Sequence, residues 1–192
     1  MRADEVRAMI RSIIERNRQA CERFLSSKLK EFRKFYGTNV LNPWKLLMYR
    51  NIQLFRADLS AYNVRGFFKI STDRRPQIYY DGKLKNPELR YTIMHEIAHE
   101  LLMEYVKEHL PDNVKESLSN VVYDQVVDSK IMSNRADVIE KLCDDFAMEA
   151  LMPMDMCNQL RAKYGGNIND ERLAEYFGLE KELIRSRLET GR

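Results

Sequence analysis

Histidine is scarce in this chain of 192 residues, which holds three histidines, and cysteine is equally rare. Three widely spaced cysteines do not make a disulfide framework, so their number favours a reducing compartment such as the cytoplasm. The opening segment MRADEVRAMIRSIIERNRQ is charged throughout and lacks the apolar core of a signal peptide. No segment approaches the length of a membrane span, so we expect a cytoplasmic protein without membrane contact.

An excess of charge of one sign is also lacking. Charged residues make up 32% of the chain and hydrophobic residues 44%, yet the net charge is only +3. Such a dense but nearly balanced charge favours solubility and gives little support for nucleic-acid binding. A chain of this length can bury a proper core, so we expect a single domain over residues 1–192.

Two of the three histidines belong to one short motif, His95-Glu96-Ile97-Ala98-His99. On a helix, side chains four residues apart lie on one face, one turn apart. Both imidazoles can therefore reach one cation, while Glu96 stands close enough to handle a proton. Zinc hydrolases need this arrangement: two neutral nitrogen ligands, an open position for water and a carboxylate base beside it.

The segment around the motif favours a helix. Residues 90–107 contain no glycine or proline, and Ile93 and Ile97 belong to an apolar stripe at helical spacing. Asn86-Pro87 predicts a turn before this helix. The alternative is that two histidines fall four residues apart by chance on an amphipathic surface helix. The scarcity of histidine argues against that alternative.

A catalytic zinc usually has a third protein ligand, and a second predicted helix over residues 138–153 offers candidates. Its apolar residues recur at helical spacing until a Met-Pro pair ends it. Glu140 and Asp144 share one face with small residues, which would let two helices pack closely. We predict that Glu140 binds the metal. Asp144 would hydrogen-bond the outer ring nitrogen of a ligand histidine and fix its tautomer.

Other possible donors have competing interpretations. Cys143 lies on the same face as Glu140, and a thiolate is also a good zinc ligand, although we favour the carboxylate. Asp145 and Glu149 point elsewhere and are expected to be solvated. His109 lies too far past the motif to reach the same metal without a chain reversal, so we expect a surface histidine near a helix end.

The two motifs together resemble the ImmA/IrrE-type metallopeptidases. The first motif, HEIAH, follows the residues RYT. The second, EKLCDDFAMEALMP over residues 140–153, is similar to the Glu-x-x-Ala-Asn/Asp-x-Phe-Ala and Leu-Met-Pro pattern of that family. The resemblance covers about residues 52–188, and the pair of motifs is more specific than either alone. The chain departs from the family at Cys143, where alanine is usual, and in a longer spacer between the motifs.

The resemblance implies one Zn²⁺ ion per chain on His95, His99 and Glu140, with Glu96 as the catalytic carboxylate. It also implies a cytoplasmic zinc metalloendopeptidase. Its substrate would be a regulatory protein, such as a repressor-type transcription regulator of a phage or mobile element.

The implied mechanism gives Glu96 two proton transfers. Glu96 accepts the proton of a zinc-activated water and later delivers it to the leaving amine. Zinc and a second donor would stabilise the oxyanion. Tyr91 and Tyr164 are candidates for that donor, although a structural role is the favoured interpretation of both.

Two other functions stay open. The chain could be a zinc-containing regulatory protein that binds a repressor or another partner without turnover, but an intact Glu96 favours the enzyme. DNA binding through residues 154–192 is the weakest alternative. That segment resembles the helix-turn-helix core of small DNA readers, but its predicted second helix mixes glutamates with its basic residues.

The whole chain is predicted to adopt an α+β fold with a zincin-like core. Residues 1–36 form an N-terminal helical region, one long helix or two consecutive ones. Its apolar stripe packs on the core or, alternatively, on a partner. The catalytic core spans residues 38–153. Residues 154–192 form a helical C-terminal tail, in which Asn169 or Asp170 caps a helix.

Three short strands, Ile52–Leu54, Gly66–Ile70 and Gln77–Tyr80, are expected in a small antiparallel sheet. Pro76 at the start of the third run indicates an edge strand. An exposed edge beside a zinc site is a natural place for an extended peptide to add as a strand. The spacer over residues 106–137 has helical potential but no assigned function.

Overall fold

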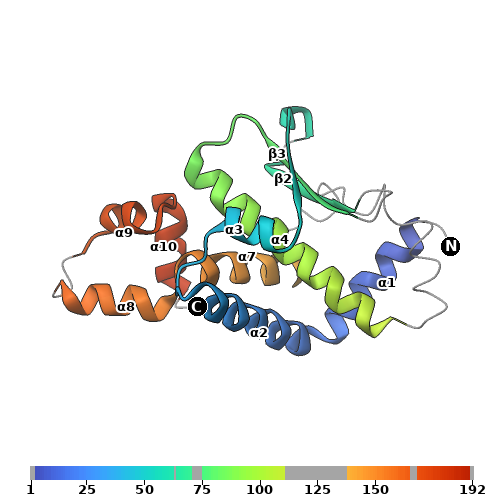
Figure 1. Ribbon diagram of the computed structural model, residues 1–192, viewed down its shortest axis with the longest axis horizontal. Helices are drawn as coiled ribbons and strands as arrows, with labels where there is room; N and C mark the ends of the chain where they lie inside the picture. The colour runs from blue at the N-terminus through green and yellow to red at the C-terminus, as the bar shows by residue number, and fades with distance from the viewer. Residues whose placement is uncertain (1–2, 63, 71–74, 111–137, 165–167, 191–192) are drawn as a thin grey trace.

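The computed structural model describes residues 3–62, 64–70, 75–110, 138–164 and 168–190. Over these residues the fold is α+β, with one small three-stranded sheet lying on a body of helices (Figure 1). Most of the spacer predicted over residues 106–137 lies outside the described residues, so its interpretation stays a prediction. Within the described part of the chain, no helix is both long enough and apolar enough to cross a membrane.

Two consecutive helices form the N-terminal region, α1 (Ala3–Arg16) and α2 (Arg18–Tyr36). The break falls at Asn17, whose side-chain amide donates to the carbonyl of Ile13 at 2.9 Å. Gly37 ends α2 with a φ of 63°, a left-handed conformation that glycine adopts without strain because it has no Cβ. The buried face of α2 packs on the two central helices of the core, as the sequence favoured.

The central helices carry the two predicted motifs. The HEIAH motif lies on α4 (Asn86–His109), and the second motif lies on α7 (Val138–Leu151). α4 begins earlier than predicted, so the turn expected at Asn86-Pro87 is wrong. Pro87 lies in the first turn of the helix, where proline is tolerated because the first N–H groups have no partner inside the helix. α4 and α7 pack closely, and α1 and α2 contact both.

The sheet is mixed, so the prediction of an antiparallel sheet is wrong. Its strands are β1 (Gln53–Ala57), β2 (Gly66–Ile70) and β3 (Pro76–Asp81), in the order β1-β3-β2. β2 pairs antiparallel with β3, whereas β1 pairs parallel with β3. β1 and β3 run in the same direction, and β2 runs in the opposite direction. Only with β2 in the middle would every neighbouring pair be antiparallel. Here the third strand inserts between the first two.

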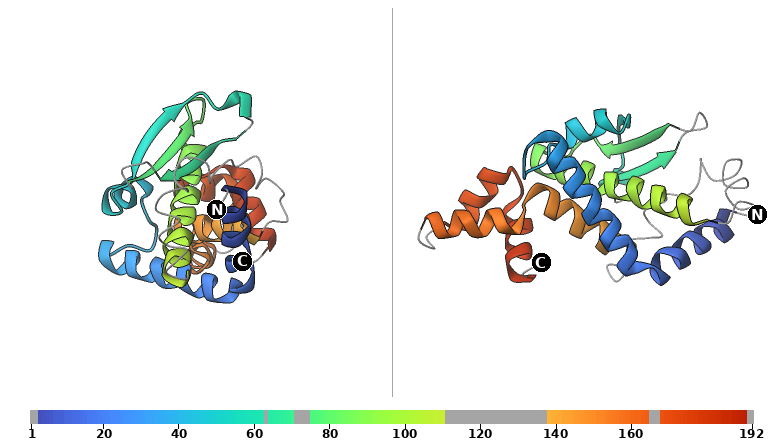
Figure 2. Two further views of the ribbon diagram at one scale, coloured as in Figure 1. Left: turned by 90° about the vertical axis from the view of Figure 1, so that its right-hand side faces the viewer. Right: turned by 60° about the horizontal axis from the view of Figure 1, so that its bottom comes forward.

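Pro76 does not mark an edge strand, because β3 is the central strand of the sheet. Pro76 is the first residue of β3, a position that proline can hold inside a sheet. The edges are therefore β1 and β2. The inner face of the sheet, with the buried Phe68 and Ile78, packs on α4 (Figure 2).

Short elements connect these parts. α3 (Pro43–Tyr49) follows α2, and the side chain of Asn42 caps it by accepting a hydrogen bond from the N–H of Trp44 at 2.9 Å. A single turn of 3-10 helix (Ser60–Tyr62) lies between β1 and β2.

Three helices form the C-terminal tail: α8 (Met154–Lys163), α9 (Asp170–Phe177) and α10 (Lys181–Thr190). They lie at one end of the molecule, away from the sheet (Figure 1). Of the two predicted caps, Asn169 is the one observed, because its side chain accepts from the N–H of Arg172 at 3.0 Å.

Glu149 ties the tail to the core, contrary to the prediction that it is solvated. One carboxylate oxygen lies 3.0 Å from Nη2 of Arg33 on α2, and the other lies 2.7 Å from Nη2 of Arg187 on α10. Arg187 is buried, so solvent and salt screen this pair less than a surface pair. Asp145, predicted to be solvated as well, is exposed.

We expect Glu149→Ala to lower the free energy of unfolding by about 2 kcal/mol, because it removes this carboxylate from a buried guanidinium. The effect is smaller than for a fully buried pair, since 33% of the Glu149 side chain is exposed. Denaturant unfolding followed by circular dichroism measures the change. Glu175→Ala, at an exposed tail position, is the control and should change stability by less than about 0.5 kcal/mol. Equal effects of the two substitutions would contradict a stabilising role for the contacts of Glu149 with Arg33 and Arg187.

Candidate metal centre

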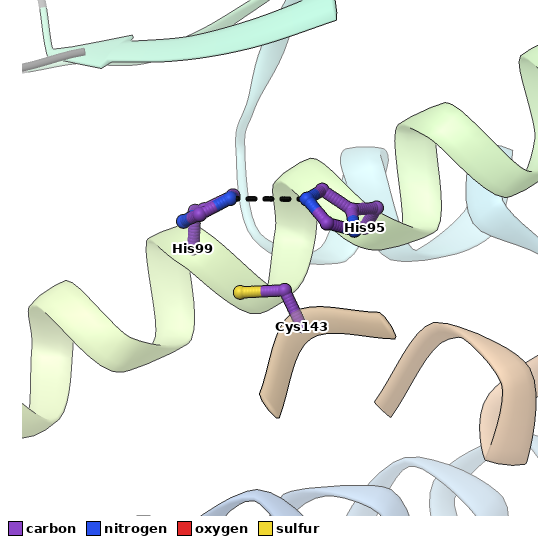
Figure 3. A group of neighbouring side chains, drawn as sticks. All are labelled: His95, His99 and Cys143. Atoms are coloured by element: carbon purple, nitrogen blue, oxygen red, sulfur yellow. Dashed lines mark hydrogen bonds between the residues drawn. The ribbon is translucent and has the colours of Figure 1, made fainter. Parts of the chain in front are cut away.

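The central helix α4 brings two imidazoles together. His95 and His99 lie one turn apart, and their Nε2 atoms are 3.1 Å from each other (Figure 3). Both side chains are largely buried. Two imidazole nitrogens at this spacing can face one cation.

Glu140 adds a carboxylate from the facing helix α7. One of its oxygens lies 3.2 Å from Nε2 of His95, and the other lies 3.3 Å from Nε2 of His99. Ligand atoms at about 2.0–2.2 Å from a tetrahedral zinc ion lie roughly 3.3–3.5 Å from one another. The three donors, 3.1–3.3 Å apart, are therefore close to the spacing that zinc requires. Two histidines and a glutamate are also one of the ligand sets of catalytic zinc.

Asp144 contacts the outer nitrogen of His95. Its Oδ1 atom lies 2.8 Å from Nδ1 of His95, and the hydroxyl of Tyr91 donates to the same oxygen. A proton on Nδ1 leaves Nε2 with a free lone pair, which is the tautomer that a metal ligand needs. The Tyr91 hydroxyl is thus occupied with Asp144, and it helps to fix the position of that carboxylate.

Two residues considered from the sequence lie elsewhere. Tyr164 is exposed at the end of α8. His109 is the last residue of α4, where its Nδ1 lies 2.7 Å from the carbonyl of Tyr105 and its ring stacks on the Tyr105 ring. This exposed position agrees with the prediction of a surface histidine near a helix end.

The acids around the histidines concentrate negative charge at the centre. Burial lowers the pKa of His95, but its hydrogen bonds with Asp144 and Glu140 outweigh burial and raise that pKa to about 10. Burial raises the pKa of Glu140, but hydrogen bonds with both histidines outweigh it and hold that pKa well below its usual range. The charge that attracts a proton to His95 is also the charge that would attract a cation.

Glu96 is buried beside the same centre, with 5% of the residue exposed. Burial raises the pKa of its carboxyl, while His99 and His95 oppose this rise. The backbone N–H of Phe68 on β2 hydrogen-bonds the carboxylate, whereas Oε2 has no hydrogen-bond partner among the described residues. A buried carboxylate oxygen without a partner is costly. This oxygen is therefore available to a water or substrate group at the centre.

Gly66, which sequence reasoning did not single out, lets β2 approach the helix at this point. A Cβ atom on Gly66 would lie 2.6 Å from Cγ2 of Thr92 and 2.9 Å from the carbonyl oxygen of Tyr79. The same Cβ would lie 3.6 Å from Oε1 of Glu96. A glycine at the start of a strand gives no signal of this approach in a single sequence, because the contact is between distant segments.

We expect Gly66→Ala to destabilise the fold by about 1–3 kcal/mol, because the added methyl must push β2 away from α4 or from β3. If β2 moves, the backbone of Phe68 also moves away from Glu96. Thermal unfolding followed by circular dichroism measures the change in stability. Gly82→Ala is the control, since the nearest atoms to its Cβ would belong to the flexible side chain of Arg56, which can move aside. An unchanged Gly66→Ala protein would contradict the close approach.

Cys143 is a further donor near the centre. Its thiol sulfur and ring nitrogens of His95 and His99 all lie within 4.8 Å of one another. Figure 3 shows the cysteine side chain reaching from α7 toward the two imidazoles on α4. The sequence flagged this residue, but the distance could not be known before the two helices were placed together.

Comparison with known proteins gives a family and a distant structural neighbour. The model of a peptidase family described as the IrrE N-terminal-like domain matches residues 47–189. No curated protein matches. A solved structure of a Mycobacterium tuberculosis transcriptional regulator is similar with a TM-score of 0.54 and 15% identity, over 94% of this chain. The chain spans 50% of the length of that regulator, and a likeness at this identity shows the fold alone.

Proposed function

Because this chain belongs to the peptidase family of the IrrE N-terminal-like domain, we propose that it is a zinc-dependent endopeptidase. The observation that carries the proposal is the convergence of His95, His99 and Glu140 at the spacing of zinc ligands. The second support is the buried carboxylate of Glu96 beside them, with one oxygen that has no described partner.

In this proposal, His95, His99 and Glu140 hold one zinc ion per chain. When bound, zinc lowers the pKa of a coordinated water toward neutrality and polarises the scissile carbonyl. Asp144 holds the Nδ1 proton of His95, so that Nε2 faces the cation. The Tyr91 hydroxyl keeps Asp144 in place for that task.

Glu96 moves the protons. Its Oε2 atom accepts a proton from the attacking water and returns it to the leaving amine. Burial against β2 excludes bulk water from the carboxylate. Burial raises the pKa of this carboxyl and a hydrogen bond from the backbone of Phe68 opposes that rise, so β2 contributes to the electrostatics of the proposed base.

The edge strand β2 is where we place the substrate. β2 has β3 on one side only, and its Phe68 already contacts the catalytic carboxylate through the backbone. An extended peptide that adds along this edge would pass beside Glu96. The hypothesis of peptide addition at a sheet edge therefore moves from the third strand to β2.

We propose a cytoplasmic regulatory protein, such as a repressor-type transcription regulator, as the source of that peptide. The support is the resemblance of the two motifs to the ImmA/IrrE-type metallopeptidases. The alternative is a zinc-containing regulatory protein that binds such a partner without turnover. The proximity of Cys143 to the histidines favours that alternative, since a closed metal site leaves no position for water.

DNA binding through α10 is disfavoured because its basic side chains pair with carboxylates of the protein. On α10, Lys181 pairs with Glu171, and Arg185 lies 3.5 Å from Asp170. Arg187 is buried and pairs with Glu149. Basic side chains that are paired within the protein release few counterions from DNA, so we expect weak DNA affinity at physiological salt.

A peptide library derived from a cytoplasmic proteome distinguishes endopeptidase activity from binding without turnover. The zinc-loaded protein should generate new peptide termini at one or few sequence contexts, as detected by mass spectrometry, and chelation should stop their formation. Stoichiometric zinc without any new termini would favour the binding protein.

A further inference from the structure

Cys143 occupies a position from which it can join the metal ligands. It lies on α7 three residues after Glu140, so both side chains face α4. The residue is fully buried, and its sulfur lies between the two central helices with the imidazoles of His95 and His99 (Figure 3).

The distances allow a bond to the same ion. A zinc ion bound to sulfur at about 2.3 Å and to nitrogen at about 2.0–2.1 Å brings those two atoms to roughly 3.6 Å. The sulfur and the ring nitrogens lie within 4.8 Å of one another, so the sulfur is at most about 1.2 Å farther from the nitrogens than such a site requires. Rotation of the thiol about its Cα–Cβ bond and a small shift of α7 can close such a gap.

Glu140 and Cys143 approach the histidine pair from the same helix, α7. The Glu140 oxygens lie at 3.2 and 3.3 Å from the histidine nitrogens, and the Cys143 sulfur lies within 4.8 Å of ring nitrogens of both histidines. Two imidazoles, one carboxylate and one thiolate make four protein donors, the number found in closed zinc sites.

We propose that Cys143 is a fourth protein ligand of the metal, a proposal that rests on the metal centre proposed above. Its thiolate competes with water for the remaining coordination position, so it holds the metal more tightly and restrains hydrolysis. It also shifts the metal preference of the site toward soft cations, because thiolate binds zinc, cadmium and cobalt better than manganese or magnesium.

Cobalt substitution reads the thiolate directly. Protein loaded with one equivalent of Co²⁺ should show an intense thiolate-to-cobalt charge-transfer band in the near ultraviolet. The band should vanish in Cys143→Ser and Cys143→Ala, while the weaker visible bands of bound cobalt remain. Cys157→Ala is the matched control, because Cys157 is also fully buried and lies on α8. That variant should keep the band.

Metal affinity gives the second readout. Loss of an outer partner of a ligand weakens metal binding about 10- to 100-fold. Replacement of Cys143 by serine or alanine should therefore raise the Kd of the protein for zinc by at least about tenfold, because it removes a direct ligand. X-ray absorption of the unmodified zinc protein needs no variant and should show one sulfur scatterer at about 2.3 Å.

The outcomes separate this proposal from the one on which it rests. One cobalt per chain without a charge-transfer band, and no sulfur scatterer around zinc, would overturn the role of Cys143 and leave the histidine and glutamate site standing. Failure of the unmodified protein to bind any metal would overturn both. A band that is lost in Cys143→Ser but kept in Cys157→Ala supports the fourth ligand.

Discussion

Glu96→Gln is expected to keep the zinc content of the protein and to slow peptide hydrolysis about 100- to 10,000-fold, the contribution of a positioned general base. The amide has nearly the same shape and can still accept the hydrogen bond from the Phe68 N–H. It cannot take a proton from the attacking water. Metal analysis and the rate of cleavage, measured on the same preparation, test both halves of this expectation.

Two controls make the Glu96 result specific. Asp145→Asn makes the same chemical change at an exposed position of α7 and should leave both zinc content and turnover unchanged. His99→Ala should lose both, since it removes a ligand. Undiminished proteolysis by zinc-replete Glu96→Gln would refute the assigned role of this carboxylate.

Arg50→Met is expected to lower the free energy of unfolding by about 3 kcal/mol, because it removes the cationic partner of two partly buried carboxylates. Arg50 forms two hydrogen bonds with Glu100, at 2.7 and 3.0 Å, and also pairs with Glu104. Glu100 directly follows His99 on α4, and 13% of its side chain is exposed. Lys28 still pairs with Glu104 at 2.8 Å, which keeps the expected loss below that of a fully unpaired cluster.

Denaturant unfolding at two pH values tests the Arg50 cluster. Burial raises the pKa of Glu100 even though Arg50 opposes this rise. Without Arg50, that pKa should rise further, so the folded variant takes up a proton as the pH falls toward it. The stability difference between the two proteins should therefore shrink at low pH. Arg18→Met, which breaks an exposed pair with Glu22, should cost less than about 1 kcal/mol. If Arg50→Met lowered the free energy of unfolding no more than Arg18→Met does, the expectation would be contradicted.

Apart from the approach of Glu140 and Asp144 to the two histidines, which the paired motifs predicted, the features that the sequence predicted are local in the chain. The spacing of His95 and His99 and the apolar stripe beside them depend on one helix, and the α+β composition follows from such segments one at a time. The same holds for Asn169, whose capping bond reaches only to Arg172. Patterns of this kind are readable because their periodicity is set by a single element.

The features that the sequence missed depend on distant segments. The parallel pairing of β1 with β3 follows from the strand order, which no pattern within a strand encodes. Gly66 matters because Thr92 and Tyr79 lie against it. The position of Glu149 on its helix predicted a solvated side chain, yet Glu149 pairs with Arg33 of α2 and Arg187 of α10. Each of these contacts exists only after the chain has packed.

Zinc content measured by elemental analysis tests the central claim most directly. The unmodified protein, prepared with sufficient zinc and then freed of excess, should carry one zinc ion per chain. Glu140→Ala should carry clearly less than one, because it loses one of the donors, and Asp145→Ala, a carboxylate removed from the exposed side of α7, should carry one. A zinc-free unmodified protein, or full zinc content in Glu140→Ala, would contradict the site formed by His95, His99 and Glu140.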